Sequence, residues 1–341
     1  MSENKQENKK RLKTGWLKYL LPIAILIFTI HMVLPDLATL GNTIKVLQSM
    51  SIWLVLLALL AEIVSYMGSG YLLKVLVTLG KSKFSIFRGV LIYTASSSIG
   101  LVAGGWVANA VTTHHWVLQN KDISPQEAAL TAFIPNLYNY SLISVLTLLS
   151  MAYLQIINEL TKLHVVLYGV VLLIAILGNL FMIYGISHRE WIERFACGPL
   201  LSLIRLFKRK YDAAGIRSAL DHVYGGLVML DKRGWSKPAI GSLMNVGFDM
   251  LCLYLLFIAA GHPINVIVLI AGYGFSILIG LAAFFVPGGV GVVESGLVAI
   301  FTSLGVPAEV SVVVALSYRL FSFWIPSILG FAITGYLGRQ K

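Results

Sequence analysis

The sequence predicts an all-α, polytopic integral membrane protein with about six to eight transmembrane helices, some of them broken and re-entrant. Its 341 residues are 57% hydrophobic and only 12% charged, whereas soluble domains carry about 25% charged residues. The mean hydropathy is +0.82. Long apolar runs recur along the whole chain, and Gly- and Pro-rich breaks interrupt several of them. This composition excludes an ordinary soluble enzyme and a disordered chain.

Positive charge is concentrated in two segments. The net charge is +11, and sixteen of the 26 Lys and Arg residues lie within residues 1–18 and 189–237. Both segments flank apolar runs, as cytoplasmic loops or surfaces facing anionic lipid do. We therefore expect a multi-pass protein of the plasma membrane whose N-terminus and basic loop 189–237 are cytoplasmic. The expected partners are anionic membrane lipids and not nucleic acid.

The first half of the chain contains five apolar runs: Trp16–Leu34, Ile52–Leu79, Val90–Asn120, Ala128–Asn158 and Leu163–Ile186. No small-residue cleavage site follows the first run, so we interpret it as an uncleaved helix. The third run has no Asp, Glu, Lys or Arg, and it is rich in Ser and Gly. The pair Gly104-Gly105 can turn the chain, and the hydroxyls can satisfy the freed backbone groups. We expect this run to be re-entrant, because five full crossings would place the basic loop outside.

The second half is almost free of charge. Residues 238–338 contain four charged side chains, and three Gly- and Pro-containing breaks divide them into the runs 238–260, 264–286, 290–304 and 308–337. Gly and Pro end helices, so each break predicts a helix boundary.

Two patterns of the first half recur in the second. Val102-Ala103-Gly104-Gly105 recurs as Val286-Pro287-Gly288-Gly289, and Ser124–Ala128 recurs as Val306–Val310. We interpret residues 1–341 as one integral membrane domain with inverted repeats over 52–158 and 238–338, as in many transporters. Chance recurrence in a Gly-rich chain is the alternative. The loop 189–237 interleaves apolar and basic residues, so it could lie among lipid headgroups or act only as a topogenic signal.

The segment from Pro287 to Glu294 combines a Gly-Gly break with an acid inside apolar sequence. An intramembrane carboxylate is costly and indicates function, and unwound backbone beside it could contact an ion. The alternative is that Glu294 is simply a partner of the helix dipole. The planar fork of Arg319 suits a phosphate or a carboxylate such as Glu294. A structural ion pair and a phosphodiester site therefore both stay open.

Glu62 and Asp249 are further acids within apolar runs. Each could take up protons during transport or bond to nearby polar groups. His114 and His115 would point about 100° apart on a helix, so we interpret them as a hydrated interfacial pair and not as metal ligands. Polar residues near Pro135 are expected to make packing hydrogen bonds between helices: Asn136, Tyr138 and Asn139.

Catalytic signatures are missing from the sequence. There is no P-loop, no dinucleotide fingerprint, no nucleophile elbow and no HExxH motif. The two cysteines lie 55 positions apart with no Cys/His cluster, so no disulfide scaffold or zinc site is indicated. We expect no catalytic residues, no metal and no cofactor.

The C-terminal pattern resembles the flippase-like integral membrane family that includes the transmembrane region of lysylphosphatidylglycerol synthase. The matching residues are Phe285–Ser295, Leu304-Gly305-Val306 and Ser317-Tyr318-Arg319-Leu320. The resemblance covers about 285–330 by motif and the whole chain by hydropathy plan. The first half departs from the pattern, because no acid or Arg lies near 104–112.

The resemblance implies a lipid flippase that moves an anionic or glycosylated lipid, of the phosphatidylglycerol or polyprenyl-linked type, between leaflets. The candidate lipid-binding residues are Gly104, Gly105, Pro287, Gly288, Gly289, Glu294 and Arg319, and the candidates for proton coupling are Glu62 and Asp249. The alternative is the membrane subunit of a lipid-modifying transferase whose soluble catalytic domain is a separate chain. Lysyl transfer belongs to a soluble domain of the synthase and is not expected here, although the resemblance alone would suggest the name phosphatidylglycerol lysyltransferase. An oligomer is compatible with all of these functions.

Overall fold

The computed structural model describes residues 40–80, 82–103, 105–157, 162–197, 213–282 and 289–339. Four helical segments among them are long and apolar enough to cross a membrane: Ile52–Gly80, Pro125–Ile156, Ser236–Ala259 and Ala308–Gly338. A pair bent by 117°, Leu172–Ser187 and Arg189–Phe195, could provide a fifth span. The predicted fold class, an all-helical polytopic membrane protein, is confirmed. The first predicted run, Trp16–Leu34, lies outside the described residues.

The first half forms a sequence of helices that includes one tight hairpin. These helices are α2 (Leu40–Ser49), α3 (Ile52–Val77), α4 (Ile86–Ala103), α5 (Gly105–Leu118) and α6 (Pro125–Ile156). A 3-10 turn, η2 (Thr78–Gly80), follows α3. The chain reverses between α4 and α5 at Gly105, whose φ is +66°, a conformation that residues with a Cβ atom rarely adopt. The hairpin therefore turns where the sequence predicts it.

The start of α6 is fixed by a buried carboxylate. Ser124 and Glu127 form a capping box: the Ser124 hydroxyl accepts from the Glu127 N–H, and Glu127 Oε2 accepts from the Ser124 N–H at 2.9 Å. Glu127 Oε1 also accepts from the Gly80 N–H at 2.8 Å, and Ser82 donates to the same carboxylate. These bonds satisfy free N–H groups at the helix start and tie α6 to the turn after α3.

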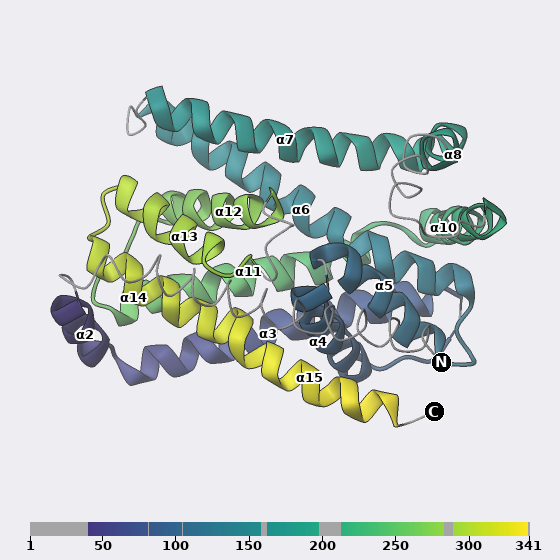
Figure 1. The fold of residues 1–341 in the computed structure, drawn as a ribbon, viewed down its shortest axis with the longest axis horizontal. Coiled ribbons are helices and arrows are strands. Elements are labelled where there is room, and N and C mark those ends of the chain that lie inside the picture. The colour runs from purple at the N-terminus through teal and green to yellow at the C-terminus, as the bar shows by residue number, and fades with distance from the viewer. Residues whose placement is uncertain are drawn as a thin grey trace, which may run out of the picture.

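The segment 189–237, which the sequence indicates as a loop, is largely helical where it is described. It follows α7 (Lys162–Ser187) and contains α8 (Arg189–Cys197) and α10 (Ala213–Arg233). Arg189 pairs with Asp221, which joins α8 to α10. Both helices lie at one end of the molecule, on the same side as α5 (Figure 1).

The second half contains a second helical hairpin. Its helices are α11 (Ser236–Ala259), α12 (Val266–Ala282), α13 (Val292–Ser303), α14 (Ala308–Arg319) and α15 (Ile325–Gly338), with a π-helical turn, η4 (Leu320–Trp324), between the last two. The chain returns between α12 and α13 through Gly289 and Gly291, which also have positive φ. In Figure 1 the hairpin α12–α13 lies toward one end of the molecule and α4–α5 lies toward the other.

Helices α3 and α11 pack antiparallel through small residues at the centre. A Cβ atom on Gly68 would meet the Asn245 backbone, and one on Gly241 would meet Leu72. Ser65 donates to the Asn245 carbonyl at 2.9 Å. Small side chains of this kind let helices approach closely inside a membrane.

The two hairpins are held in place by matching contacts. On α4, Thr94 and Ser98 contact Gly330 of α15 so closely that a Cβ atom on this glycine would overlap them. On α12, Gly274 faces Thr147 of α6 in the same way. Each hairpin thus packs against the last long helix of the opposite half.

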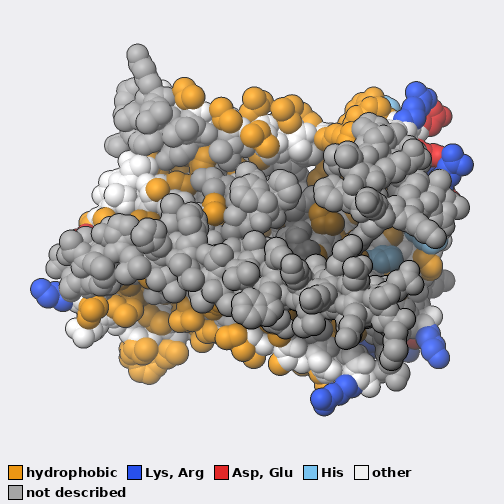
Figure 2. Space-filling view, viewed as in Figure 1, with side chains coloured by type: hydrophobic (Ala, Val, Ile, Leu, Met, Phe, Trp, Pro, Cys, Tyr) orange, Lys and Arg blue, Asp and Glu red, His pale blue; other side chains and the backbone are white. Residues whose placement is uncertain are grey.

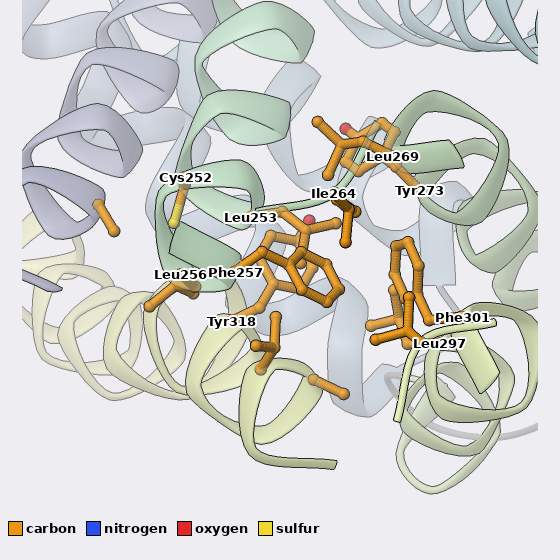
Figure 3. Packing of buried hydrophobic residues seen from close by; sticks show 14 of the residues in the cluster. Cys252, Leu253, Leu256, Phe257, Ile264, Leu269, Tyr273, Leu297, Phe301 and Tyr318 are labelled. Carbon is orange, nitrogen blue, oxygen red and sulfur yellow. The ribbon is translucent and has the colours of Figure 1, made fainter. Parts of the chain in front are cut away.

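The core and the surface are both apolar, as expected in a bilayer. Phe257 of α11 and Phe301 of α13 meet edge to face with ring centroids 4.7 Å apart (Figure 3). In Figure 2 hydrophobic side chains cover the upper and lower margins, whereas Lys and Arg side chains lie toward the two ends. Exposed Leu, Ile and Phe side chains are numerous along α3, α7 and α15, which fits contact with lipid.

Candidate lipid-binding cavity

A cavity of about 340 Å³ lies between the two halves of the molecule. The turns of both hairpins border it, through Gly105 on one side and Gly289 on the other. Its walls come from α3, α4, α5, α6, α11, α12, α13, α14 and the turn η4, and they carry many polar groups in an otherwise apolar protein. The charged and amide side chains on the walls are Glu62, Asp249, Arg319, Asn109, Asn136, Asn139 and Asn245.

Arg319 is fixed on the cavity wall by an ion pair. Its Nε donates to Glu294 Oε1 at 2.7 Å, and each of the two side chains is only 10% exposed. The second oxygen, Glu294 Oε2, accepts from the Gly291 N–H at 2.8 Å. The guanidinium carbon lies 3.9 Å from the centroid of the Phe323 ring, a cation–π distance. Glu294 therefore acts both as a cap of α13 and as the counter-ion of Arg319.

The helix that carries Arg319 changes its geometry directly after this residue. Residues Leu320–Trp324 form a π-helical turn, and π-helical turns occur frequently at functional sites. The Tyr66 hydroxyl donates to the Ser322 carbonyl at 3.3 Å, so α3 contacts the widened turn. Ser322 and Phe323 of this turn both line the cavity.

Two acids from opposite halves meet at the cavity. Asp249 on α11 accepts hydrogen bonds from the Tyr273 hydroxyl at 2.7 Å and the Tyr318 hydroxyl at 2.8 Å. Glu62 on α3 is 4% exposed, and its Oε2 has no hydrogen-bond donor among the described residues. The two carboxyl groups lie within hydrogen-bonding reach of each other.

Amide side chains complete the polar wall. Asn139 of α6 donates to Asn245 at 2.9 Å and accepts from the Ser242 hydroxyl at 2.6 Å, which links α6 to α11. The expected packing role of Asn139 is therefore confirmed, and the same side chain also faces the cavity. Tyr138 donates to the Trp235 carbonyl at 2.6 Å, a second packing contact between helices.

The structure brings together most of the candidate residues from the sequence. Gly105, Gly289, Glu62, Asp249 and Arg319 all line one cavity, and Glu294 stands directly behind Arg319. Three candidates lie outside the described residues: Gly104, Pro287 and Gly288.

Sequence reasoning missed the tyrosines and several small polar residues of the cavity. A signal for some of them was present: polar side chains recur at helical spacing around the two acids. On α3 these are Glu62, Ser65, Tyr66 and Ser69, and on α11 they are Ser242, Asn245 and Asp249. Tyr273 and Tyr318 gave no such signal, because each reaches Asp249 from a different helix.

A family profile described as Lysylphosphatidylglycerol synthase TM region matches residues 18–330. The chain belongs to this family. The match includes both hairpins and every residue that lines the cavity, so the cavity is built entirely from the family's transmembrane region. The family resemblance seen in the sequence is confirmed.

Three curated relatives are UPF0104 membrane proteins of archaea. The protein of Methanocaldococcus jannaschii is 27% identical over 153 residues, 44% of this chain and 45% of the relative. That of Pyrococcus horikoshii is 28% identical over 150 residues, 40% of this chain and 44% of the relative. That of Methanothermobacter thermautotrophicus is 28% identical over 164 residues, 46% of this chain and 47% of the relative.

The matched region spans somewhat less than half the length of these relatives. No solved structure matches the chain. Together with the long apolar helices, the family match identifies a multi-pass membrane protein.

Proposed function

We propose that the protein moves an anionic phospholipid of the phosphatidylglycerol type between the two leaflets of the plasma membrane. The observation that carries this proposal is the buried cation, Arg319, on the wall of the central cavity. A charged side chain at membrane depth is expensive and marks functional sites. A guanidinium group has five N–H donors, so Glu294 and a lipid phosphate can be bound together.

The cavity has a suitable size for a lipid headgroup. Its volume of about 340 Å³ is at the lower end of small-molecule sites, which measure about 300–1,000 Å³. A glycerol phosphate group fits such a space, whereas two acyl chains do not. The headgroup would therefore cross through the protein while the chains stay in the bilayer.

Two inverted copies of one unit would give the movement needed for transport. Helices α4 and α12 begin 180 positions apart, α6 and α14 begin 183 apart, and the hairpin turns at Gly105 and Gly289 are 184 apart. The close contacts between the halves match too. At the repeat spacing, Thr94 corresponds to Gly274 and Gly330 corresponds to Thr147, so the contact of Thr94 with Gly330 has its counterpart in the contact of Gly274 with Thr147. Because the central helices α3 and α11 are antiparallel, the copies have opposite orientation. Rocking of inverted repeats around a fixed site exposes it to each side in turn.

The copies differ at the ion pair. At the repeat spacing, Arg319 corresponds to Asn136 and Glu294 corresponds to Ala110. Among the described residues that line the cavity, the second half alone supplies a cation, and we propose the phosphate site on that side. This assigns Gly289, Glu294 and Arg319 to headgroup binding and leaves Gly105 to shape the opposite turn.

The test is lipid movement in proteoliposomes that contain purified protein and fluorescent NBD-phosphatidylglycerol. Dithionite destroys the label in the outer leaflet, so the protected fraction reports movement between leaflets. With wild-type protein we expect dithionite to destroy all of the label. With Arg319→Ala we expect the half of the label that lies in the inner leaflet to stay protected from dithionite. Arg319→Lys should recover little activity, because an ammonium cannot form the planar two-point contact. Arg339→Ala, an exposed site at the end of α15, is the control. Wild-type protein that moves no lipid, or Arg319→Ala that moves it at the wild-type rate, contradicts the proposal.

The family description also supports a second candidate, because it names a synthase. In this case the chain would be the membrane subunit that presents lipid to a separate soluble transferase. Purification of the chain from native membranes, followed by assay of lysyl transfer to phosphatidylglycerol, distinguishes the two. Transferase activity that co-purifies with a chain unable to move lipid favours the subunit.

A further inference from the structure

Glu62 and Asp249 form a pair of carboxyl groups at the boundary between the two halves of the molecule. Each lies in the middle of a central helix, α3 or α11, and both border the cavity. Neither takes part in the ion pair of Arg319 with Glu294. The lipid movement proposed above does not by itself explain why two acids are buried here. The inference that follows assigns them a task in that movement, and it therefore rests on the proposed function.

The position of the pair follows from the antiparallel packing of α3 and α11. Contacts between the two helices pass from Leu72 with Gly241 to Ser65 with Asn245. The next turn along α3 brings Glu62 opposite Asp249. These two acids are 187 positions apart, whereas the helix starts and hairpin turns repeat at 180–184, so they do not occupy equivalent positions of the two repeats. Each half nevertheless contributes one acid to the place where α3 and α11 cross. A site on the axis that relates two inverted repeats stays in contact with both halves as they rock.

The surroundings of the two acids are unequal. Asp249 accepts two tyrosine hydroxyls, which stabilise a carboxylate. Glu62 Oε2 is buried without a donor among the described residues, which suits a protonated acid whose O–H points at its neighbour. Two adjacent carboxyl groups in an apolar medium cannot both ionise easily, so a geometry of this kind favours a proton shared between them.

Other titratable or charged groups face the pair from each helix packed around it. They are Tyr66 on α3, Tyr93 on α4, Tyr140 on α6, Cys252 on α11, Tyr273 on α12, and Tyr318 and Arg319 on α14. Of these, Arg319 carries a charge at neutral pH, and it attracts the Asp249 carboxylate. A second proton on the acid pair removes this attraction and makes the site around Arg319 more favourable for an anion.

We propose that Glu62 and Asp249 bind the proton that drives the anionic lipid across the membrane, in the same direction as the lipid. A proton from water on one side forms an O–H bond with the Asp249 carboxylate while a headgroup phosphate binds near Arg319. After the two halves rock, that O–H bond breaks and the proton enters water on the opposite side as the lipid leaves. Moving one anion and one proton together transfers no net charge, which lowers the electrostatic cost of the step.

The test uses the same proteoliposomes with an imposed pH gradient, acidic outside, and a pH dye trapped inside. We expect wild-type protein to accumulate NBD-phosphatidylglycerol in the inner leaflet, on the alkaline side, while the lumen acidifies. A protonophore should return the label to equal leaflets. Glu62→Gln and Asp249→Asn should lose both the accumulation of the label and the acidification of the lumen. Glu309→Gln, which neutralises an acid in the first turn of α14 away from the cavity, should behave as wild type.

The outcomes separate this inference from the proposed function. Lipid that equilibrates equally with and without the pH gradient, or that accumulates with a sodium gradient instead, overturns proton coupling and leaves the flippase proposal standing. A complete lack of lipid movement overturns both. Infrared difference spectroscopy of the wild type gives a readout that needs no transport. A carboxylic acid band at neutral pH that disappears at alkaline pH supports the shared proton, and its absence contradicts it even if neither variant can be purified.

Discussion

Arg319 and Glu294 are 25 positions apart in the sequence and are joined by a 2.7 Å hydrogen bond between Nε and Oε1. They come from the consecutive helices α14 and α13, and both are largely buried. Glu294 is held in turn by the Gly291 N–H, whose glycine has a φ of +84°. The Gly-rich break, the acid and the cation are therefore one unit. This unit is a structural pair by geometry, and its place on the cavity wall makes it the proposed phosphate site.

The two roles of the ion pair can be separated by a double-mutant cycle. Removing one partner of a buried pair leaves an uncompensated charge and costs about 3–5 kcal/mol. We therefore expect Glu294→Gln and Arg319→Gln each to lower the thermal unfolding temperature in detergent micelles, and the double variant to recover much of the loss. Lipid movement should stay absent in all three variants. A double variant that regains both stability and lipid movement would show that the pair is structural only.

Glu127 should matter for stability and not for lipid movement. Its carboxylate is 2% exposed and accepts hydrogen bonds from Gly80, Ser82 and Ser124. Glu127→Ala leaves these donors unsatisfied, each at a cost of about 1–3 kcal/mol where it stays buried. We expect a clear fall in the unfolding temperature, with normal lipid movement in the protein that remains folded. Comparable stability of Glu127→Ala and Glu309→Gln would contradict this assignment.

The two glycines that face opposite helices should resist substitution. Gly330→Ala places a methyl group against Thr94 and Ser98, and Gly274→Ala places one against Thr147. Overpacking of this kind costs about 1–3 kcal/mol. Gly335→Ala, on the same helix as Gly330 but with open space around it, should be neutral or stabilise by up to about 1 kcal/mol. Thermal unfolding of the three variants provides the comparison. If all three unfold at the same temperature, these contacts are not tight in the membrane.

The topology prediction concerns the end of the molecule where α5, α10 and the start of α6 meet. Gly225 and Gly226 of α10 pack against Gln126, so Asn120 and Ser218 should share one side of the membrane. From the positive-inside rule we expect that side to be the cytoplasm. Single cysteines at these two positions, in a variant without Cys197 and Cys252, should not react with an impermeant maleimide added to whole cells. Labelling after permeabilisation is the control.

Unequal labelling would contradict the re-entrant hairpin. If the position at Asn120 reacted from outside and that at Ser218 did not, the run 90–120 would cross the membrane.

The order of the helices and most of their ends could be read from the sequence. The capping pattern Ser124-Pro125-Gln126-Glu127 sets the start of α6, and the Gly pair at 104–105 predicts the turn that occurs at Gly105. These are local features, since a cap or a positive φ depends on a few neighbouring residues. The helices α8 and α10 were missed because apolar and basic residues interleave there, and their helical state depends on contacts such as Arg189 with Asp221.

What the sequence alone determined is a membrane protein of many helices, with acids and one arginine at places where a bilayer makes charge expensive. The hydropathy of a segment and the cost of burying a charge in it can be judged without knowing what the charge contacts. Each of four residues could therefore be recognised from its own segment: Glu62, Asp249, Glu294 and Arg319. Which charges meet was decided only in the tertiary structure. Arg319 lies 70 positions from Asp249 and 25 from Glu294, and the packing of α13 against α14 selects Glu294 as its hydrogen-bonded partner. The antiparallel crossing of α3 and α11 likewise places Glu62 beside Asp249, because distances between helices depend on side-chain packing that no single segment encodes.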